Sequence, residues 1–235
     1  MNREEQSAKR KVQSTKPFLV TRDARLVTLL LLAACGGGSP LANPSPSDLA
    51  RAAPDSFDVR FETTKGPFVM RAHRSWSPSG VDRFHYLARN GFYDDAWFFR
   101  VVGDFVAQWG LPGKPPLDSV WQTRTLPDEP VKVSNTRGRI AYARGGPNTR
   151  SVQLFVNLAD NVRLDTVGTF GFPPIGEVVS GMAAVDSLYF GYGGTRTNRL
   201  PGPSQDSIRI LGNAYLTRSF PLLDRILKAS VVRRY

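Results

Sequence analysis

The sequence is poor in the side chains that hold metal ions or form disulfides. Its 235 residues include one cysteine and two histidines, His73 and His85. A single cysteine excludes an internal disulfide framework and any zinc site built on CxxC pairs, and two histidines leave little for a histidine-based metal centre. The chain also lacks strong compositional bias, since 41% of its residues are hydrophobic and 22% are charged. These values exclude a disordered acidic chain, a collagen-like chain and a coiled coil.

Clustered positive charge is absent as well, although the formal net charge is +11. Residues 1–34 hold seven Lys or Arg and three Asp or Glu, so the rest of the chain carries +7, with no run of four basic residues. Proteins that bind nucleic acid gather basic side chains into patches or stripes. The pattern therefore favours a generally cationic surface and no nucleic-acid partner. A weaker alternative, based on the charge alone, is a lipoprotein that contacts the cell wall or anionic lipid.

The apolar run near the N-terminus is short. Leu26–Ala34 spans nine residues and follows two arginines. Nine helical residues cover only about half of a bilayer core, so this run does not span a membrane, and its basic flank indicates a secretory signal. Leu32–Gly36 resembles the lipoprotein box of bacteria. The resemblance implies a signal peptide over residues 1–34 and lipidation of Cys35. The alternative is a free cysteine after an ordinary signal peptide.

Residues 35–55 have the composition of a flexible tether. They are rich in Gly, Ser and Pro, which leaves little apolar surface to bury. The sequence therefore predicts a lipid anchor at Cys35, a tether to residue 55 and one domain over residues 56–235. The lipoprotein resemblance implies a location in the bacterial cell envelope, facing the periplasm. The outer membrane is favoured over the inner one because no aspartate follows Cys35.

Short strands dominate the expected structure of residues 56–235. Glycine and proline account for 21 and 18 residues, which is typical of a chain with many turns. The segment 57–61 alternates apolar and charged residues, the pattern of a half-buried strand. Helices are expected over 77–90 and 182–188. The other expected strands are 68–72, 97–102, 105–109, 138–143, 153–158 and 231–232. Many short strands and two helices predict a mainly β, closed or nearly closed antiparallel barrel.

Arg100 is the most unusual polar residue of the expected strands. It follows three aromatic residues and precedes two valines, so a guanidinium lies in a segment that otherwise favours burial. A buried arginine usually needs a carboxylate partner, which makes a structural ion pair one interpretation and a functional cation the other. Gln108 lies eight residues later. It shares a face with Arg100 only if the strand is unbroken, and Gly103 makes a bend expected there.

Four segments in order resemble the cyclophilin family of peptidyl-prolyl isomerases. The first carries Arg100, Phe105 and Gln108 at the family's spacing. The four matching segments are 99–110, 138–156, 164–165 and 176–182. The resemblance implies a closed eight-stranded antiparallel barrel capped by two helices. It also implies cis/trans isomerisation of the peptide bond before proline, a reaction that uses no metal and no cofactor.

The family reaction assigns a role to Arg100. Resonance gives the peptide bond a rotation barrier of about 18–20 kcal/mol, and the twisted state leaves a lone pair on the prolyl nitrogen. A fixed cation that donates hydrogen bonds to this nitrogen stabilises the twisted amide over either planar form. Arginine suits the task because its planar fork stays charged. By resemblance, Arg100 is the catalytic cation, and Phe105 and Gln108 complete the catalytic set.

The resemblance also implies an apolar pocket for the proline ring and polar contacts to the peptide backbone. The expected substrate-binding residues are Val106, Arg144, Gln153, Phe155, Leu164 and Phe170. Aromatic walls suit a rigid, apolar ring, and Phe105 is expected to form part of them. Gln108 is expected to bind a substrate carbonyl and to hold Arg100. For Phe105 and Phe155 taken individually, simple core packing is the alternative.

Three features depart from the family pattern. Arg163 stands where cyclosporin-sensitive members have tryptophan, and its charge is expected to favour acidic residues near the substrate proline. The loop 166–174 is longer than in the family and lacks the usual pocket histidine, so Phe170 or Phe172 is expected in that space. The tail from residue 205 is also longer. Phe220–Leu227 is expected to form a short helix before the last strand.

The sequence thus predicts a lipid-anchored, monomeric peptidyl-prolyl isomerase. Its expected partners are proline-containing unfolded or exported polypeptides. A non-catalytic proline-peptide binding module or holdase on the same fold is the alternative. Retention of Arg100 favours the enzyme, because a simple binder needs no group suited to a twisted amide.

Overall fold

The computed structural model describes residues 39–193 and 201–235. The expected signal peptide and Cys35 lie outside these residues. The strands are β1 (Ser56–Thr63), β2 (Phe68–His73), β3 (Arg100–Val102), β4 (Val106–Trp109), β5 (Arg139–Tyr142), β6 (Leu154–Asn157), β7 (Pro174–Ser180) and β8 (Ile226–Arg234). The helices are α1 (Pro46–Leu49), α2 (Pro78–Arg89), α3 (Pro115–Trp121), α4 (Met182–Asp186), α5 (Gln205–Leu211) and α6 (Asn213–Ser219), with a 3₁₀ turn at Val162–Asp165. The described residues contain no helix that is long and apolar enough to span a membrane.

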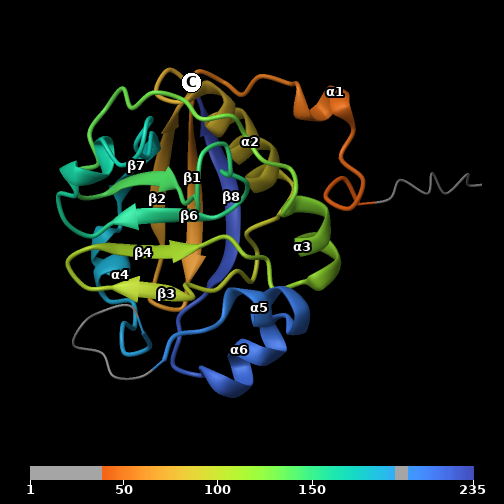
Figure 1. The fold of residues 1–235 in the computed structure, drawn as a ribbon, viewed down its shortest axis with the longest axis vertical. Helices are drawn as coiled ribbons and strands as arrows, with labels where there is room; N and C mark the ends of the chain where they lie inside the picture. The colour runs from red at the N-terminus through yellow and green to blue at the C-terminus, as the bar shows by residue number, and fades with distance from the viewer. Residues whose placement is uncertain (1–38, 194–200) are drawn as a thin grey trace, which may run out of the picture. The chain divides into compact units, whose positions relative to one another are not determined.

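The eight strands form one curled antiparallel sheet in the order β3-β4-β6-β5-β7-β2-β1-β8 (Figure 1). The prediction of a mainly β antiparallel fold is confirmed, but the prediction of a closed barrel is wrong. Within the described chain, β3 and β8 are not paired as strands. Only one isolated bridge, Trp97 with Arg225, joins the segments that precede them. The sheet stays open because β3 has three residues and begins after this bridge.

Side-chain alternation divides the central strands between two environments. Ala107 and Trp109 of β4 lie in the main core, whereas Val106 belongs to a separate apolar cluster on the outer face. Phe155 of β6 also lies in this outer cluster, while its neighbours Leu154 and Val156 enter the core. Successive side chains of a strand point to opposite faces. All four residues of β4 are therefore buried, yet only half of them stabilise the interior of the sheet.

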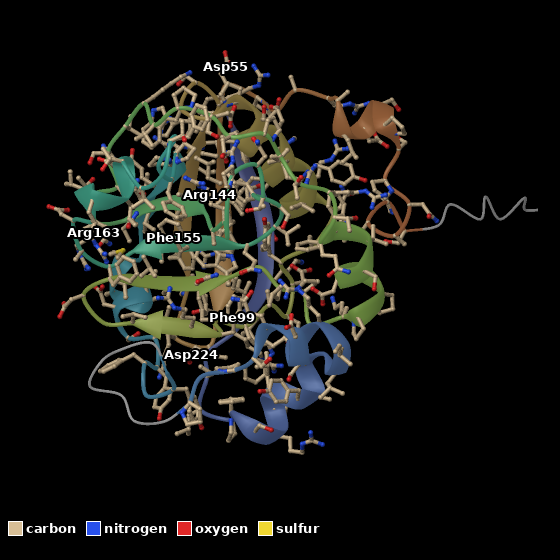
Figure 2. All side chains as sticks on the ribbon, viewed as in Figure 1. Asp55, Phe99, Arg144, Phe155, Arg163 and Asp224 are labelled. Atoms are coloured by element: carbon tan, nitrogen blue, oxygen red, sulfur yellow. The ribbon has the colours of Figure 1, made fainter. Side chains whose placement is uncertain are left out.

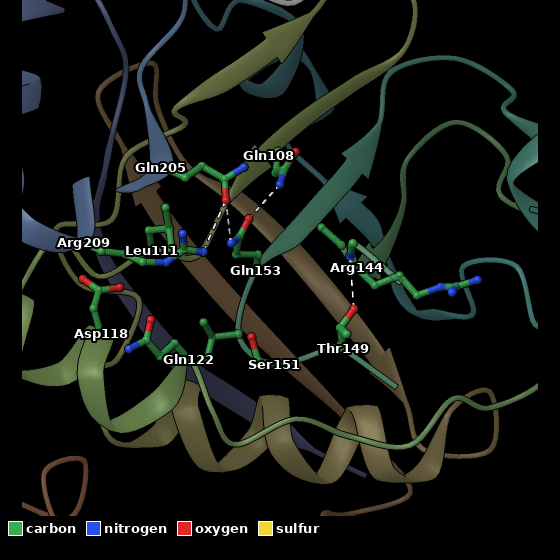
Figure 3. Close-up of a pocket in the computed structure, with 13 residues that line it drawn as sticks. Gln108, Leu111, Asp118, Gln122, Arg144, Thr149, Ser151, Gln153, Gln205 and Arg209 are labelled. Atoms are coloured by element: carbon green, nitrogen blue, oxygen red, sulfur yellow. Dashed lines mark hydrogen bonds between the residues drawn. The ribbon is translucent and has the colours of Figure 1, made fainter. Parts of the chain in front are cut away.

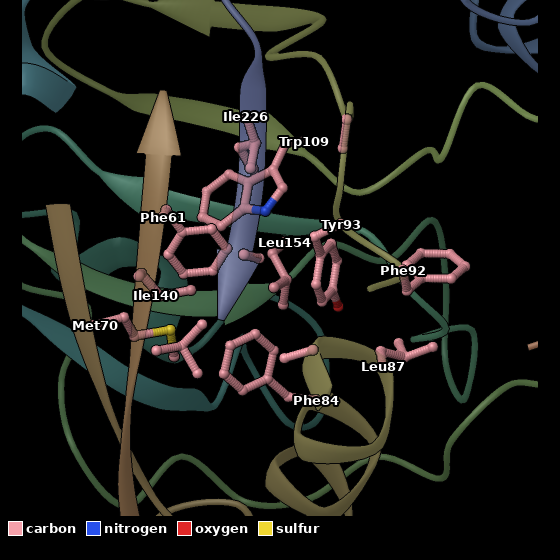
Figure 4. Packing of buried hydrophobic residues seen from close by; sticks show 14 of the residues in the cluster. Phe61, Met70, Phe84, Leu87, Phe92, Tyr93, Trp109, Ile140, Leu154 and Ile226 are labelled. Carbon is pink, nitrogen blue, oxygen red and sulfur yellow. The ribbon is translucent and has the colours of Figure 1, made fainter. Parts of the chain in front are cut away.

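Aromatic side chains fill the core between the sheet and α2 (Figure 4). The ring of Phe61 lies 4.7 Å from that of Phe68 and 6.0 Å from that of Trp109, measured between centroids. Phe84 of α2 contacts Tyr93 at 5.8 Å. Helix α2 begins at Pro78, a residue suited to the first helical position. Each fully buried ring contributes about 1.5–3 kcal/mol through the hydrophobic effect.

The tail differs from the sequence-based expectation. The predicted helix over 220–227 is wrong, since α5 and α6 lie before it and β8 begins at Ile226. Ile208 of α5 and Leu216 of α6 pack in a second apolar cluster together with Trp97 and Phe99. The side chain of Asp224 (labelled in Figure 2) accepts hydrogen bonds from Thr64 Oγ1 at 2.7 Å and from the Tyr189 amide at 2.7 Å. These bonds fix the turn that leads into β8.

The described part of the expected tether, residues 39–55, contacts the domain. The Tyr86 hydroxyl donates to the Pro40 carbonyl at 2.7 Å, and the Trp121 indole donates to the Leu41 carbonyl at 2.9 Å. The Ala53 amide donates to Asp82 Oδ1 at 2.8 Å. These bonds hold the segment against α2 and α3, so in the structure residues 39–55 are not a free tether.

Candidate active site

A tight hairpin places Arg100 and Gln108 side by side. The turn between β3 and β4 includes Asp104, whose φ of 57° lies in the left-handed region. In the resulting register Arg100 is directly opposite Gln108, and paired residues of an antiparallel ladder project to the same face. Arg100 Nη1 donates to Gln108 Oε1 at 3.4 Å. The bend expected near Gly103 is therefore a full reversal, and it brings the two polar residues together.

Arg100 has no carboxylate partner among the described residues. It is half-buried, and burial lowers the pKa of its guanidinium from the ordinary value. A guanidinium remains charged in proteins despite such a change. The interpretation of Arg100 as a structural ion pair thus has no support in the described chain. Its charge faces a pocket instead.

The pocket beside Arg100 has a volume of about 400 Å³ and lies over β4 and β6. It is lined by Arg100, Phe105, Val106, Gln108, Ala143, Arg144, Phe155, Leu164, Phe172 and Gln205. The structure therefore brings together seven of the nine residues predicted for catalysis and substrate binding. Gln153 lines the neighbouring pocket, and Phe170 lines neither. Figure 2 labels Arg144 and Phe155, which come from adjacent parts of this face.

Phe172, and not Phe170, forms the wall supplied by the long loop. The ring of Phe172 contacts that of Phe155 edge to face at 5.7 Å between centroids. Phe170 is 40% exposed and lines neither pocket, so the structure does not bring this predicted substrate-binding residue together with the others. The loop turns at Gly171, where φ is 58° and an added Cβ would lie 2.2 Å from the Asp165 carbonyl oxygen. Only glycine fits this close approach.

Arg144 holds the loop in place. Its guanidinium donates to the Gly171 carbonyl at 2.9 Å and to the Val167 carbonyl at 2.9 Å. It also lies over the ring of Phe172, 5.1 Å from the centroid. The side chain of Arg144, a predicted substrate-binding residue, thus fixes one wall of the pocket.

Two guanidinium groups flank Phe105. The Cζ of Arg163 lies 4.6 Å from the ring centroid and that of Arg100 lies 5.6 Å from it. The backbone carbonyl of Phe105 accepts hydrogen bonds from the Asn161 side chain and the Leu158 amide, both at 2.8 Å. The backbone of Phe105 is therefore fixed by two hydrogen bonds, while its ring attracts two cations. The rim of the pocket is positively charged.

A second pocket of about 300 Å³ adjoins the first (Figure 3). Gln108 and Arg144 line both cavities, while Asp118 of α3 and Arg209 of α5 line only the second. The side chain of Asp118 is almost completely buried and its Oδ2 atom has no hydrogen-bond partner among the described residues. Burial raises the pKa of Asp118 from its ordinary value of 3.8 to about 7, against the opposing effect of Arg209.

Sequence reasoning missed the contribution of α3 and α5 to these pockets. Their residues Asp118, Gln205 and Arg209 carry no local pattern that separates them from ordinary polar helix positions. Only the packing of the tail against the sheet brings them to the site. Among the residues that the structure describes, no group of three His, Cys, Asp or Glu side chains could hold a metal ion.

The fold and this site together define a class of protein. Its members have a curled antiparallel sheet whose outer face carries an apolar slot next to an arginine, and in the described chain this arginine has no carboxylate partner. The family model described as cyclophilin type peptidyl-prolyl cis-trans isomerase matches residues 58–211. The chain belongs to this family and is a peptidyl-prolyl cis-trans isomerase.

Individual relatives agree with the family model. The chain is 33% identical over 143 residues to peptidyl-prolyl cis-trans isomerase B of Escherichia coli, covering 55% of this chain and 82% of that protein. It is 30% identical over 157 residues to peptidyl-prolyl cis-trans isomerase-like 1 of Emericella nidulans, covering 66% and 91%. A crystal structure of a Cryptosporidium parvum cyclophilin type isomerase has a similar fold, with a TM-score of 0.55 at 17% identity. That similarity covers 75% of this chain and 98% of the other.

Proposed function

We propose that Arg100 is the catalytic cation of this isomerase and that the pocket beside it receives the substrate proline. The observation that carries the proposal is a half-buried guanidinium with no carboxylate partner in the described chain, next to a slot of about 400 Å³. Even a half-buried cation is costly when no internal counter-charge offsets its lost hydration. Its retention is expected where a bound substrate offers an electron pair to the guanidinium. A further crystal structure of the Cryptosporidium parvum isomerase was determined in the presence of the dipeptide Ala-Pro.

The proposed mechanism separates binding from rotation. The proline ring is held by apolar contact with Val106, Phe155, Leu164 and Phe172. This contact fixes the prolyl side of the peptide bond that rotates. The residue before proline then rotates, while Arg100 donates hydrogen bonds to the prolyl nitrogen as its lone pair localises. Because the planar amide offers no such lone pair, this interaction is stronger in the twisted state and lowers the barrier. No bond is broken or formed.

Replacement of Arg100 tests the mechanism. Loss of one donor that is aimed at a developing charge costs about 10²–10³ in rate in well-studied enzymes. We expect Arg100→Ala to lower kcat/KM by about 100-fold, and Arg100→Lys by about tenfold, because lysine keeps the charge but lacks the planar fork. A protease-coupled assay of proline isomerisation gives both values. Equal rates for the wild type and Arg100→Ala would favour the alternative, a proline-peptide binding module or holdase.

We further propose that the enzyme is a lipoprotein that acts on exported polypeptides in the bacterial cell envelope, with the outer membrane favoured. The support is the sequence alone, namely a basic flank, the short apolar run Leu26–Ala34 and the single cysteine Cys35 at its end. Mass spectrometry of the mature protein is expected to find a lipidated Cys35 as the first residue. Cys35→Ser is expected to move the protein from the membrane fraction to the soluble fraction. An unmodified cysteine in the mature chain would refute the proposal.

A further inference from the structure

Helix α5 contributes one residue, Gln205, to the pocket that faces Arg100. Gln205 is the first residue of the helix, which is preceded by Ser204 as a cap whose hydroxyl accepts from the Ser207 amide. Ile208, one turn later, is completely buried in the second apolar cluster. The cap and the buried isoleucine fix where the backbone of Gln205 lies, so its side chain is presented to the site from a fixed position.

Gln205 belongs to a line of side-chain amides that ends at Arg100 (Figure 3 shows its three glutamines). Arg100 Nη1 donates to Gln108 Oε1 at 3.4 Å, and Gln108 Nε2 donates to Gln153 Oε1 at 2.8 Å. Gln153 Nε2 in turn donates to Gln205 Oε1 at 2.9 Å. Arg209 Nη2 donates to the same Gln205 oxygen at 3.5 Å. The line therefore has an arginine at each end and three glutamines between them.

The two arginines set the direction of every bond in the line. A glutamine amide can present its oxygen or its NH₂ group after a half-turn, but a guanidinium can only donate. Arg209 requires an oxygen from Gln205, and that oxygen also accepts from Gln153. The oxygen of Gln153 is thereby turned toward Gln108, and the oxygen of Gln108 toward Arg100. Any reversed amide would place a donor against a donor.

We propose that Gln205 is a positioning residue for the isomerisation, because its carboxamide oxygen fixes the orientation of Gln153 and Gln108 and, through them, the direction of the Arg100 guanidinium. The inference rests on the proposed catalytic role of Arg100. Arg100 has no carboxylate in the described chain to direct it, so Gln108 Oε1 is its side-chain acceptor. Without Gln205, Gln153 Nε2 loses its acceptor, so Gln153 no longer holds Gln108 in one position and the Arg100 guanidinium is directed less rigidly.

The variants of Gln205 separate this role from simple packing. Gln205→Leu and Gln205→Asn remove the acceptor at the required distance, and each is expected to lower kcat by about threefold to tenfold with KM changed by less than about twofold. Gln205→Glu keeps an acceptor oxygen for both Gln153 and Arg209, so its kcat is expected to stay within about twofold of the wild type. Gln122→Leu is the matched control, since Gln122 lines the second pocket but lies outside the amide line.

The outcomes are distinguishable from a failure of the catalytic assignment. A wild-type kcat in Gln205→Asn overturns the positioning role, and so does a loss in Gln205→Glu equal to that in Gln205→Asn. These two variants decide the question even if Gln205→Leu does not fold. If Arg100→Ala retains full activity, the role of Arg100 fails first, whereas a large effect of Arg100→Ala with no effect of Gln205→Asn refutes only the inference about Gln205.

Discussion

Asp118 offers a sharp test of the electrostatics around the second pocket. The residue is 4% exposed, and its Oδ2 atom has no hydrogen-bond partner in the described chain. Burial raises the pKa from 3.8 to about 7, although the charge of Arg209 acts in the opposite direction. The unfolded chain releases this proton near pH 4, whereas the folded chain retains it to about pH 7. The contribution of Asp118 to the free energy of unfolding is therefore most favourable below about pH 4. It is lost as the pH rises to about 7.

The size of the effect follows from the same pKa. Each pH unit between the folded and unfolded values corresponds to about 1.36 kcal/mol. The upper limit is then about 4 kcal/mol above pH 7, and access of water from the pocket reduces it to about 1–4 kcal/mol. Asp118→Asn removes the titration. We expect the variant to be more stable than the wild type by about this amount at pH 8 and equal to it at pH 4.

Urea or thermal unfolding at pH 4, 6 and 8 measures the difference directly. For a chain of this size, about 1 kcal/mol corresponds to a change in Tm of about 2–4 °C. Asp206→Asn is the control, because Asp206 is exposed on α5 and pairs with the same Arg209 at 2.9 Å, and surface pairs contribute little. A stability difference between Asp118→Asn and the wild type that does not grow with pH would refute the reasoning.

Three further predictions concern the pocket and its support. Phe172→Ala is expected to lower kcat/KM by about tenfold through lost apolar contact with the proline ring, while Phe170→Ala leaves it unchanged, and a reversed order would restore the sequence-based assignment. Glu129 accepts bonds from Ser77, Ser79 and Arg150, which outweigh burial and hold its pKa below the ordinary value. Glu129→Gln is thus expected to cost about 3–5 kcal/mol at pH 7, a difference that shrinks in urea unfolding as the pH falls through the lowered pKa. Arg163→Ala is expected to reduce kcat/KM about threefold more for peptides with an acidic residue next to proline than for neutral peptides, and equal losses would exclude charge selection.

Local patterns predicted the strands well because alternation depends only on neighbouring residues. The segment 57–61 became β1, with its three apolar side chains completely buried. Helix α2 begins at Pro78 and ends before Asn90, as the turn residues indicate. Closure of the barrel could not be read in this way. It depends on the length of β3 and on where the chain enters it after Trp97, and neither the alternation nor the turn residues encode these features.

The candidate site could be predicted only in part, because its assembly depends on turns and loop contacts that local patterns do not encode. Arg100 and Gln108 are eight residues apart, and only a reversal at the hairpin turn makes them neighbours. The choice between Phe170 and Phe172 depended on how Arg144 and Gly171 shape the loop. Hydrophobicity alone does not distinguish two phenylalanines separated by one residue, although in an extended segment they would share a face.

The position of the pocket on the outer face of β4 and β6 has a consequence for the tail. A sheet face that carries Arg100 and Gln108 needs polar partners, whereas apolar and aromatic side chains fill the main core on the other face. The partners must come from elements that cover the outer face. Helix α5 does this with Gln205, while its Ile208 buries apolar surface in the second cluster. The tail thus stabilises one end of the sheet and supplies the last polar member of the site, so substitutions in α5 are expected to affect stability and activity through different residues.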